Sequence, residues 1–309
     1  MKLLEKNNNI GVAANGVFVM YLNLIFMVFC YSFQALFCKI FSLKYKGNES
    51  VSSMIFTVIM GTFISFSTFL AGGLVFNPTS LTIIYGILNA LSYVLYNVAL
   101  IKATSSGPYA FTMIVNLFGG IIVPVLFSAL FLNEKLSLFQ LSAIIVMLAS
   151  FVVMNLKGLN LKGVNLKYYI WCFLTFLANG AFTTLIKVQQ TALKGNERVE
   201  MIMITYGFAA IMCFVFLLFS RKKQAFSDFK TGRGAMLAVL ACGVFSTMAA
   251  NINFYMASRL PAAILFTVNC GGVLILSAIY AVMIFKEKLS IFQVIGIIMS
   301  LLSIFMLSV

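Results

Sequence analysis

Apolar residues follow one another along this chain in long runs that are interrupted only briefly by polar residues. A helix needs about 20 apolar residues to cross the hydrocarbon layer of a bilayer. Runs of about that length occur ten times in the sequence. They predict membrane-spanning helices at 16–41, 51–75, 80–103, 108–131, 138–156, 167–189, 200–220, 235–258, 261–284 and 291–308.

The breaks between the runs are short and have the composition of loops. Examples are SLKYKGNES, FNPTS, KGLNLKGVNLK and RKKQAFSDFKTGRG, which combine charged residues with Gly, Pro, Asn and Ser. The first fifteen residues, MKLLEKNNNIGVAAN, are polar and lack the apolar region and cleavage site of a signal peptide. We expect residues 1–15 to form a loose tail and the run after them to remain as a membrane helix.

One short phrase occurs twice, as NEKLSLFQ at 133–140 and as KEKLSIFQ at 286–293. The likeness extends upstream, because 108–140 aligns with 261–293 without a gap. We interpret this as duplication of a five-helix unit, with the first repeat at 16–158 and the second at 159–309. Matched residues include Pro108/Pro261, Asn116/Asn269, Gly119/Gly272, Glu134/Glu287 and, more loosely, Asn97/Asn251 and Lys39/Lys187.

An odd number of helices in each repeat makes the second repeat begin on the opposite side of the membrane from the first. The two repeats are then related by an axis in the membrane plane, as in many secondary transporters, whose substrate site lies between the repeats. The predicted fold is therefore an all-α integral membrane protein with ten transmembrane helices in two inverted five-helix repeats.

Two halves that each close with helix, E-K-L-S-x-F-Q and helix resemble the drug/metabolite transporter superfamily, in particular its EamA-like family. The likeness covers the chain from about Gly16 onward. It implies a transporter with a central cavity lined by spans one, three, four, six, eight and nine. Where the family often has Gly before the Glu, this chain has Asn133 and Lys286.

Polar side chains in the middle of a span usually face a bundle interior or a cavity, because lipid solvates them poorly. Such residues fall in the six spans that the resemblance assigns to the cavity. The candidate substrate-binding residues are Tyr31, Gln34, Asn89, Tyr93, Tyr96, Asn97, Asn116, Asn179, Thr183, Asn251 and Asn269.

A structural role is the alternative for each candidate, since amides and hydroxyls also bridge membrane helices. Tyr93, Tyr96 and Gln34 have no partner in the other repeat, which favours substrate discrimination. The matched asparagines could instead share a packing role. The glycine pairs at 119–120 and 271–272 indicate close helix packing, with a hinge as the alternative.

Composition agrees with a membrane protein, since 62% of residues are hydrophobic and 9% are charged, against about 25% charged in soluble domains. The net charge of +14 sits in short breaks, which favours contact with anionic lipid headgroups and disfavours nucleic acid. The chain has no histidine, which removes His-based catalysis and metal binding. The six cysteines lie in apolar runs and are interpreted as buried thiols.

All seven acidic residues lie at span ends or in loops, which disfavours proton coupling through an acid inside the membrane. Three lysines, Lys39, Lys102 and Lys187, lie near span ends. We expect their ammonium groups to reach the headgroups; a vestibule that attracts anions is the alternative. Ser137 and Ser290 are expected to cap the helices that follow the repeated phrase.

Loop charge and resemblance disagree about orientation. The face that carries both termini receives Lys2, Lys6, Lys135, Lys187, Lys194, Arg198 and Arg259, and the larger remainder of the 21 basic residues falls on the other face. The positive-inside rule then predicts external termini. The resemblance implies termini in the cytoplasm, and we favour this orientation because inverted repeats weaken a one-sided charge bias.

The sequence thus predicts a multi-pass plasma-membrane transporter or facilitator of a small polar metabolite, with amino acids or related zwitterions as the first candidates. An exporter of amphiphilic or cationic compounds and a non-transporting scaffold are the alternatives. An enzyme is disfavoured, because no Walker motif or paired carboxylates accompany the missing histidines. No cofactor or metal is implied. The expected partners are a small-molecule substrate and the lipid bilayer, and the oligomeric state is left open.

Overall fold

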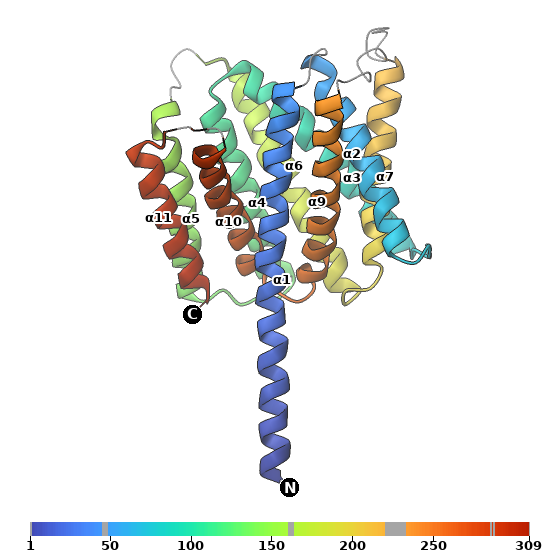
Figure 1. Cartoon of the computed structure of the whole chain (residues 1–309), viewed down its shortest axis with the longest axis vertical. Coiled ribbons are helices and arrows are strands. Elements are labelled where there is room, and N and C mark those ends of the chain that lie inside the picture. Colours follow the sequence, from blue (N-terminus) through green and yellow to red (C-terminus); the bar gives the residue numbers. More distant parts are fainter. Residues whose placement is uncertain are drawn as a thin grey trace.

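The structure is a computed structural model that describes residues 2–44, 49–159, 164–219, 233–284, 286 and 288–308. Within these ranges the regular elements are helices (Figure 1). The α-helices are α1 (Lys2–Lys44), α2 (Glu49–Ala71), α3 (Ser80–Ser106), α4 (Tyr109–Phe131), α5 (Leu138–Asn155), α6 (Leu166–Ala192), α7 (Arg198–Phe219), α9 (Arg233–Ala257), α10 (Ala262–Met283) and α11 (Ile291–Ser308), and a 3₁₀ turn, η1, covers Leu156–Gly158.

Each predicted span overlaps one of these helices. In the described part of the chain, 9 helices are long and apolar enough to cross a membrane, and Ile291–Leu307 in α11 is a shorter apolar helix. The prediction of an all-α integral membrane protein is confirmed.

The N-terminal segment differs from the loose tail that the sequence predicted. Residues 2–15 continue α1, which is 43 residues long and therefore extends about 65 Å at 1.5 Å per residue. Figure 1 shows this first part of α1 projecting beyond the bundle. The segment contains no proline to stop a helix, so the backbone hydrogen bonding of the membrane helix continues into it.

Helix packing follows the symmetry expected of two inverted repeats. α1 packs on α9, and its counterpart α6 packs on α3, the counterpart of α9. Likewise α4 packs on α6 as α10 packs on α1, and α3 on α7 as α9 on α2. The helices α2 and α7, α4 and α10, and α5 and α11 pack on their own counterparts across the axis. Equivalent helices of the two repeats therefore make equivalent helix–helix contacts.

Both termini lie toward the same end of the bundle (Figure 1), which we call the terminal face. The connections α2–α3, α4–α5, α6–α7 and α9–α10 also lie at this face, because successive helices alternate in direction. The repeated phrase NEKLSLFQ belongs to the α4–α5 turn at the terminal face. Its copy follows α10 at the opposite face, as inversion requires.

The two copies of the phrase begin their helices with the same hydrogen bonds. The Ser137 hydroxyl accepts from Gln140 N–H, and the Gln140 side chain accepts from Ser137 N–H at 3.2 Å. Ser290 and Gln293 repeat both bonds, at 2.7 and 3.3 Å. The predicted Ser caps are confirmed, and the Gln completes a capping box, which satisfies two otherwise free N–H groups.

The residue before each Glu of the phrase has a left-handed backbone. Asn133 has φ 56° and Lys286 has φ 53°. Glycine adopts this conformation at no steric cost, whereas a side chain with Cβ is strained there. Glycine is therefore the residue that would fit both positions without strain. Glu287, the copy of Glu134, lies outside the described residues.

Glycines bring α4 and α6 close together near the middle of the bundle. A Cβ on Gly119 would collide with the backbone carbonyl of Phe176, and a Cβ on Gly180 would lie 2.5 Å from Val123 Cβ. In α10, a Cβ on Gly272 would lie 2.6 Å from Val28 of α1. These contacts support the close-packing interpretation of the glycine pairs.

Candidate functional site

Tyrosines from three helices meet in the middle of the bundle. The Tyr93 ring of α3 lies 5.4 Å from the rings of both Phe182 and Tyr206, and 6.4 Å from the Tyr96 ring. Tyr206 is buried in the main hydrophobic cluster of the bundle, and Tyr31 and Tyr93 pack against this cluster. Two predicted residues of α3 thus join Tyr31 of α1 in one aromatic group.

Amide side chains surround this aromatic group. Asn253 Nδ2 of α9 donates to the Tyr31 hydroxyl at 3.2 Å. Asn179 Nδ2 of α6 donates to the backbone carbonyl of Asn116 at 2.9 Å. The Asn116 side chain lies near the Tyr96 hydroxyl, but its oxygen has no hydrogen-bond partner in the structure. The predicted asparagines of α4 and α6 therefore lie beside the tyrosines.

Several side-chain oxygens of α1, α4, α9 and α10 are buried and have no hydrogen-bond partner in the structure. Membrane helices satisfy their own backbone, so an unpaired side-chain oxygen away from water carries a desolvation penalty that a bound donor can remove. These oxygens come from both repeats, since α1 and α4 belong to the first and α9 and α10 to the second. They include Gln34 Oε1, Asn116 Oδ1, Ser246 Oγ, Asn253 Oδ1, Thr267 Oγ1 and Asn269 Oδ1.

Other predicted residues have partners within helix contacts. Asn89 Nδ2 donates to Thr205 Oγ1 of α7 at 3.3 Å, and Asn251 Nδ2 donates to Thr68 Oγ1 of α2 at 3.1 Å. These two bonds join the symmetry-related helix pairs α3–α7 and α9–α2. Asn97 and Thr183 bond to backbone carbonyls of their own helices. The oxygens of Asn97, Thr183 and Asn251 are not among the unpartnered ones, whereas Asn89 Oδ1 is buried and has no partner.

Cys38 of α1 indicates where solvent reaches the interior. Its side chain is exposed, yet it lies one helical turn after Gln34, whose backbone carbonyl accepts from Cys242 Sγ of α9 at 3.4 Å. Because residues four apart share one face of a helix, Cys38 lies on the side of α1 that contacts α9. Cys38 lies six residues before the end of α1 at the face opposite the termini. The expectation of a buried thiol is wrong at this position.

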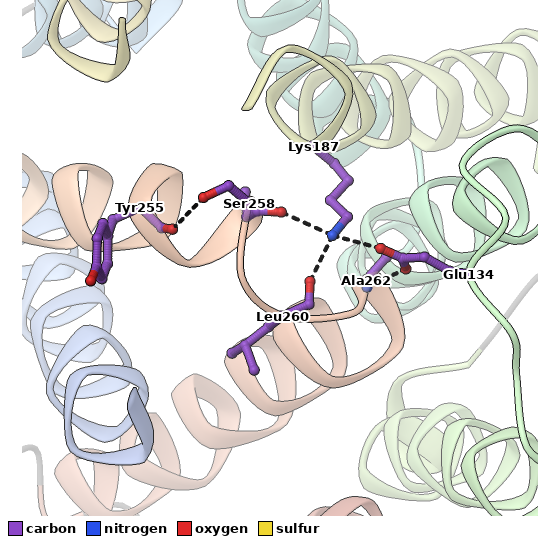
Figure 2. A network of polar contacts seen from close by, with 7 residues as sticks. Glu134, Lys187, Tyr255, Ser258, Leu260 and Ala262 are labelled. Carbon is purple, nitrogen blue, oxygen red and sulfur yellow. Dashed lines mark hydrogen bonds and ion pairs between the residues drawn. The ribbon is translucent and has the colours of Figure 1, made fainter. Parts of the chain in front are cut away.

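Lys187 corrects the expectation that the three lysines reach the headgroups. Lys39 and Lys102 are exposed, and the Lys102 ammonium lies 4.5 Å from the centre of the Trp171 ring. Lys187 is only 3% exposed and forms an ion pair with Glu134 at 2.7 Å. Figure 2 shows its ammonium group among oxygens of the α4–α5 and α9–α10 turns. A buried ammonium needs such partners because desolvation is costly.

A second acid stabilises another connection on the terminal face. Glu197, between α6 and α7, accepts from Thr79 N–H and from the Thr79 hydroxyl, both at 2.9 Å. Its partial burial raises the carboxyl pKa, but the hydrogen bonds from Thr82 and Thr79 outweigh this and lower the pKa below its ordinary value of 4.5. The interaction ties the start of α3 to the start of α7, and thereby one repeat to the other.

Two cavities lie at the margins of the bundle. One, of about 520 Å³, runs between α2 and α7 and is lined mainly by apolar side chains such as Phe66, Phe69 and Phe214. The other, of about 300 Å³, lies between α1 and α9 at the terminal face and includes Asn23, Tyr255 and Arg259. Among the described residues, no group of three Cys, Asp and Glu side chains is placed to hold a metal ion.

The comparisons with known proteins agree with this architecture. Residues 166–309, from α6 to the C-terminus, match the model of the EamA-like transporter family. The second repeat is therefore similar to members of the EamA-like transporter family. A crystal structure without a functional description is similar in fold, with a TM-score of 0.71 and 17% identity over 94% of this chain and 97% of the other. No curated protein sequence matches the chain.

The match suggests a multi-pass membrane transporter of the drug/metabolite type, as the resemblance implied. Some residues that the structure places in the bundle interior were absent from the predicted site. Tyr206 and Phe182 were missed because aromatic residues are frequent in lipid-facing positions too. Glu134 and Lys187 were noticed as a repeated acid and a span-end lysine, but no sequence pattern joins two residues so far apart. The sequence did contain one signal for this pair: a charged residue within an apolar run, such as Lys187, usually faces the bundle interior and has a partner there.

Proposed function

We propose that this EamA-like protein is a secondary transporter or facilitator of a small polar metabolite that works by alternating access of its two repeats. The first candidates are amino acids and related zwitterions. The observation that carries the proposal is the group of unpartnered, buried oxygens contributed by α1, α4, α9 and α10. Both repeats contribute to this group, which is what a shared central site requires.

The chemistry of the group favours a substrate rich in hydrogen-bond donors. The oxygens of Gln34, Asn116, Asn253 and Asn269 accept but cannot donate, so they complement ammonium or amide N–H groups. The hydroxyls of Ser246 and Thr267 can also donate, which suits a carboxylate or hydroxyl at another part of the same ligand. All acidic residues of the chain lie at span ends or in loops, so the group complements a ligand with little or no net charge.

The aromatic group supports a second candidate function, export of amphiphilic or cationic compounds. Tyr93 has three aromatic neighbours with centroids 5.4–6.4 Å away. Aromatic faces bind cations such as quaternary ammonium groups. We rank this candidate second, because the amide oxygens belong to four helices and the aromatic group can serve as one wall of a neutral site.

A counterflow measurement tests the proposal. Purified protein in liposomes is loaded with one unlabelled compound, and uptake of the same radiolabelled compound is followed for a panel of amino acids, nucleosides, sugars and quaternary amines. We expect transient accumulation of at least one amino acid or related zwitterion. Accumulation of quaternary amines alone would favour the exporter, and no flux of any compound would favour the non-transporting scaffold.

A variant gives the matched control for this measurement. Asn269→Ala removes an unpartnered oxygen of the central group, whereas Asn251→Ala removes an amide that is bonded to Thr68. We expect Asn269→Ala to abolish counterflow and Asn251→Ala to preserve it. Equal loss in both variants would contradict a central site formed by the unpartnered oxygens.

We also propose that the protein resides in the plasma membrane with its termini in the cytoplasm. A cysteine introduced at Asn8 and probed with an impermeant thiol reagent in intact cells tests this orientation. Protection of the cysteine is expected. Labelling would support the orientation that the loop charges predict.

A further inference from the structure

The Lys187 ammonium group is held entirely by protein oxygens at the terminal face. It lies 2.7 Å from Glu134 Oε1 and donates to the backbone carbonyls of Ala257 and Leu260 at 2.9 and 2.6 Å. The two carbonyls belong to the end of α9 and the turn after it (Figure 2). All three donor positions of the ammonium group are thereby used.

Glu134 completes the same network from the first repeat. Its second oxygen, Oε2, accepts from Ala262 N–H, the first residue of α10, at 2.8 Å. A carboxylate at this place also interacts favourably with the positive end of the helix dipole. One side chain of the first repeat therefore binds α6, through Lys187, and the α9–α10 turn of the second repeat.

The opposite face differs in its access to the interior. Cys38 is exposed although it lies on the face of α1 that contacts α9, whereas at the terminal face Lys187 and the neighbouring Leu260 and Ala263 are buried. Leu260 is 4% exposed and Ala263, next to the capped end of α10, is 1% exposed. The asymmetry indicates that this conformation is closed at the terminal face and open toward Cys38.

We propose that Glu134 and Lys187 form the latch that closes the terminal face, and that substrate enters the centre from the opposite face in this conformation. The inference rests on the proposed alternating access. For the terminal face to open, the α4–α5 turn must move away from α6 and the α9–α10 turn, and this separates the carboxylate from the ammonium group. Glu134 and Lys187 are thus positioning residues, which act on the equilibrium between the two conformations and not on the substrate.

Native Cys38 provides the first readout of the latch. An impermeant maleimide is applied separately to each face, in cells and in inverted vesicles whose orientation is established with a C-terminal tag, and labelling is located by mass spectrometry of peptides. Cys38 of the unmodified protein is expected to react from the face opposite the termini. Reaction of Cys38 only from the terminal face would overturn the proposal.

Variants at Glu134 provide the second readout. Glu134→Gln leaves the Lys187 charge buried and unpaired, which is strongly unfavourable, so the closed conformation should become at least about tenfold less populated. The Cys38 labelling rate should fall accordingly. A cysteine introduced by Ala263→Cys should become reactive from the terminal face in the Glu134→Gln background only.

Matched controls separate the latch from general stabilisation. Glu200→Gln removes another acid of the terminal face, in the first turn of α7, and should leave both labelling rates unchanged. Glu134→Asp is a milder variant that keeps the charge, and it replaces Glu134→Gln if that variant does not fold. A lower melting temperature with unchanged labelling from both faces would show a purely structural contact and overturn the latch.

These labelling measurements need no substrate. A negative counterflow screen therefore bears on the proposed function alone, whereas unchanged labelling bears on the latch alone. If counterflow is detected, Glu134→Gln should also lower its rate, because a carrier that cannot close the terminal face cannot complete its cycle.

Discussion

Glu134 and Lys187 form an ion pair of 2.7 Å in which each charge also binds the end of a helix. The carboxylate faces the N-terminus of α10, and the ammonium group faces carbonyls at the C-terminus of α9. Helix ends attract charges of opposite sign to their own. The surroundings of this pair therefore fix which residue must be the acid and which the base.

A charge exchange tests this polarity. The double variant Glu134→Lys/Lys187→Glu restores an ion pair, but it places an ammonium group at the N-terminus of α10 and a carboxylate beside carbonyls. We expect it to be as unstable as the single variants, which should each lose about 3–5 kcal/mol. Chemical unfolding in detergent measures the change. Recovery of wild-type stability would show that the helix ends contribute nothing to the pair.

The two classes of asparagine should respond differently to truncation. Asn116→Ala removes an unpartnered oxygen, so we expect at least a tenfold loss of kcat/KM with little change in melting temperature. Asn251→Ala removes the bond to Thr68 and should lower the free energy of unfolding by about 0.6–1.7 kcal/mol. Transport by Asn251→Ala should stay within about twofold of wild type, given its position in the α9–α2 contact. The reverse pattern would move the substrate site to that contact.

The left-handed residues of the repeated turn allow a stabilising substitution. Lys286 has φ 53°, and replacing a side chain with Gly there should stabilise the fold by about 1 kcal/mol. Asn133→Gly should gain only a few tenths of a kcal/mol, since Asn tolerates this conformation better than Lys. Thermal unfolding of both variants measures the difference. A lower melting temperature for Lys286→Gly would mean that a contact of the lysine side chain stabilises the fold by more than the left-handed backbone destabilises it.

Glu197 should make a small contribution to stability that disappears in acid. Its pKa in the folded protein is below the ordinary value of 4.5, so the folded state favours the charged form. The contribution is fully present above pH 4.5 and is lost as the pH falls through the folded pKa. Wild type should therefore be more stable than Glu197→Gln at pH 7, and the melting temperatures should converge once the pH is below the folded pKa of Glu197. If the difference in melting temperature stays constant from neutral to acid pH, the hydrogen bonds between the Glu197 carboxylate and Thr79 are not its cause.

The repeated phrase contains one feature that the sequence predicts, the helix start, and one that it does not predict, the ion pair of its Glu. The spacing of Ser and Gln in both copies predicts a helix start, and the structure shows a capping box at each because these bonds are local. The same reasoning assigned the Glu of the phrase to a turn and could go no further. Its partner Lys187 lies in another repeat, and only folding brings the two together.

The predicted site residues show the same contrast between local features and contacts that depend on the tertiary structure. Every candidate was chosen as a polar residue in an apolar run, and that criterion found both the central amides and those that join neighbouring helices. Asn116 and Asn251 look alike in sequence, but Asn251 meets Thr68 across a helix contact, whereas the Asn116 oxygen has no partner. Which role a side chain takes depends on the rotation of its helix relative to its neighbours.

The sequence by itself determined the helices, their number and the inversion of the repeats. These follow from run length, from local capping and from an odd count, all of which are properties of the chain alone. Only the tertiary structure decided which polar atoms stay unpaired, that Cys38 is exposed within the bundle, and that Lys187 is buried against Glu134. Those features depend on contacts between distant segments, since each helix could bury several of its faces equally well.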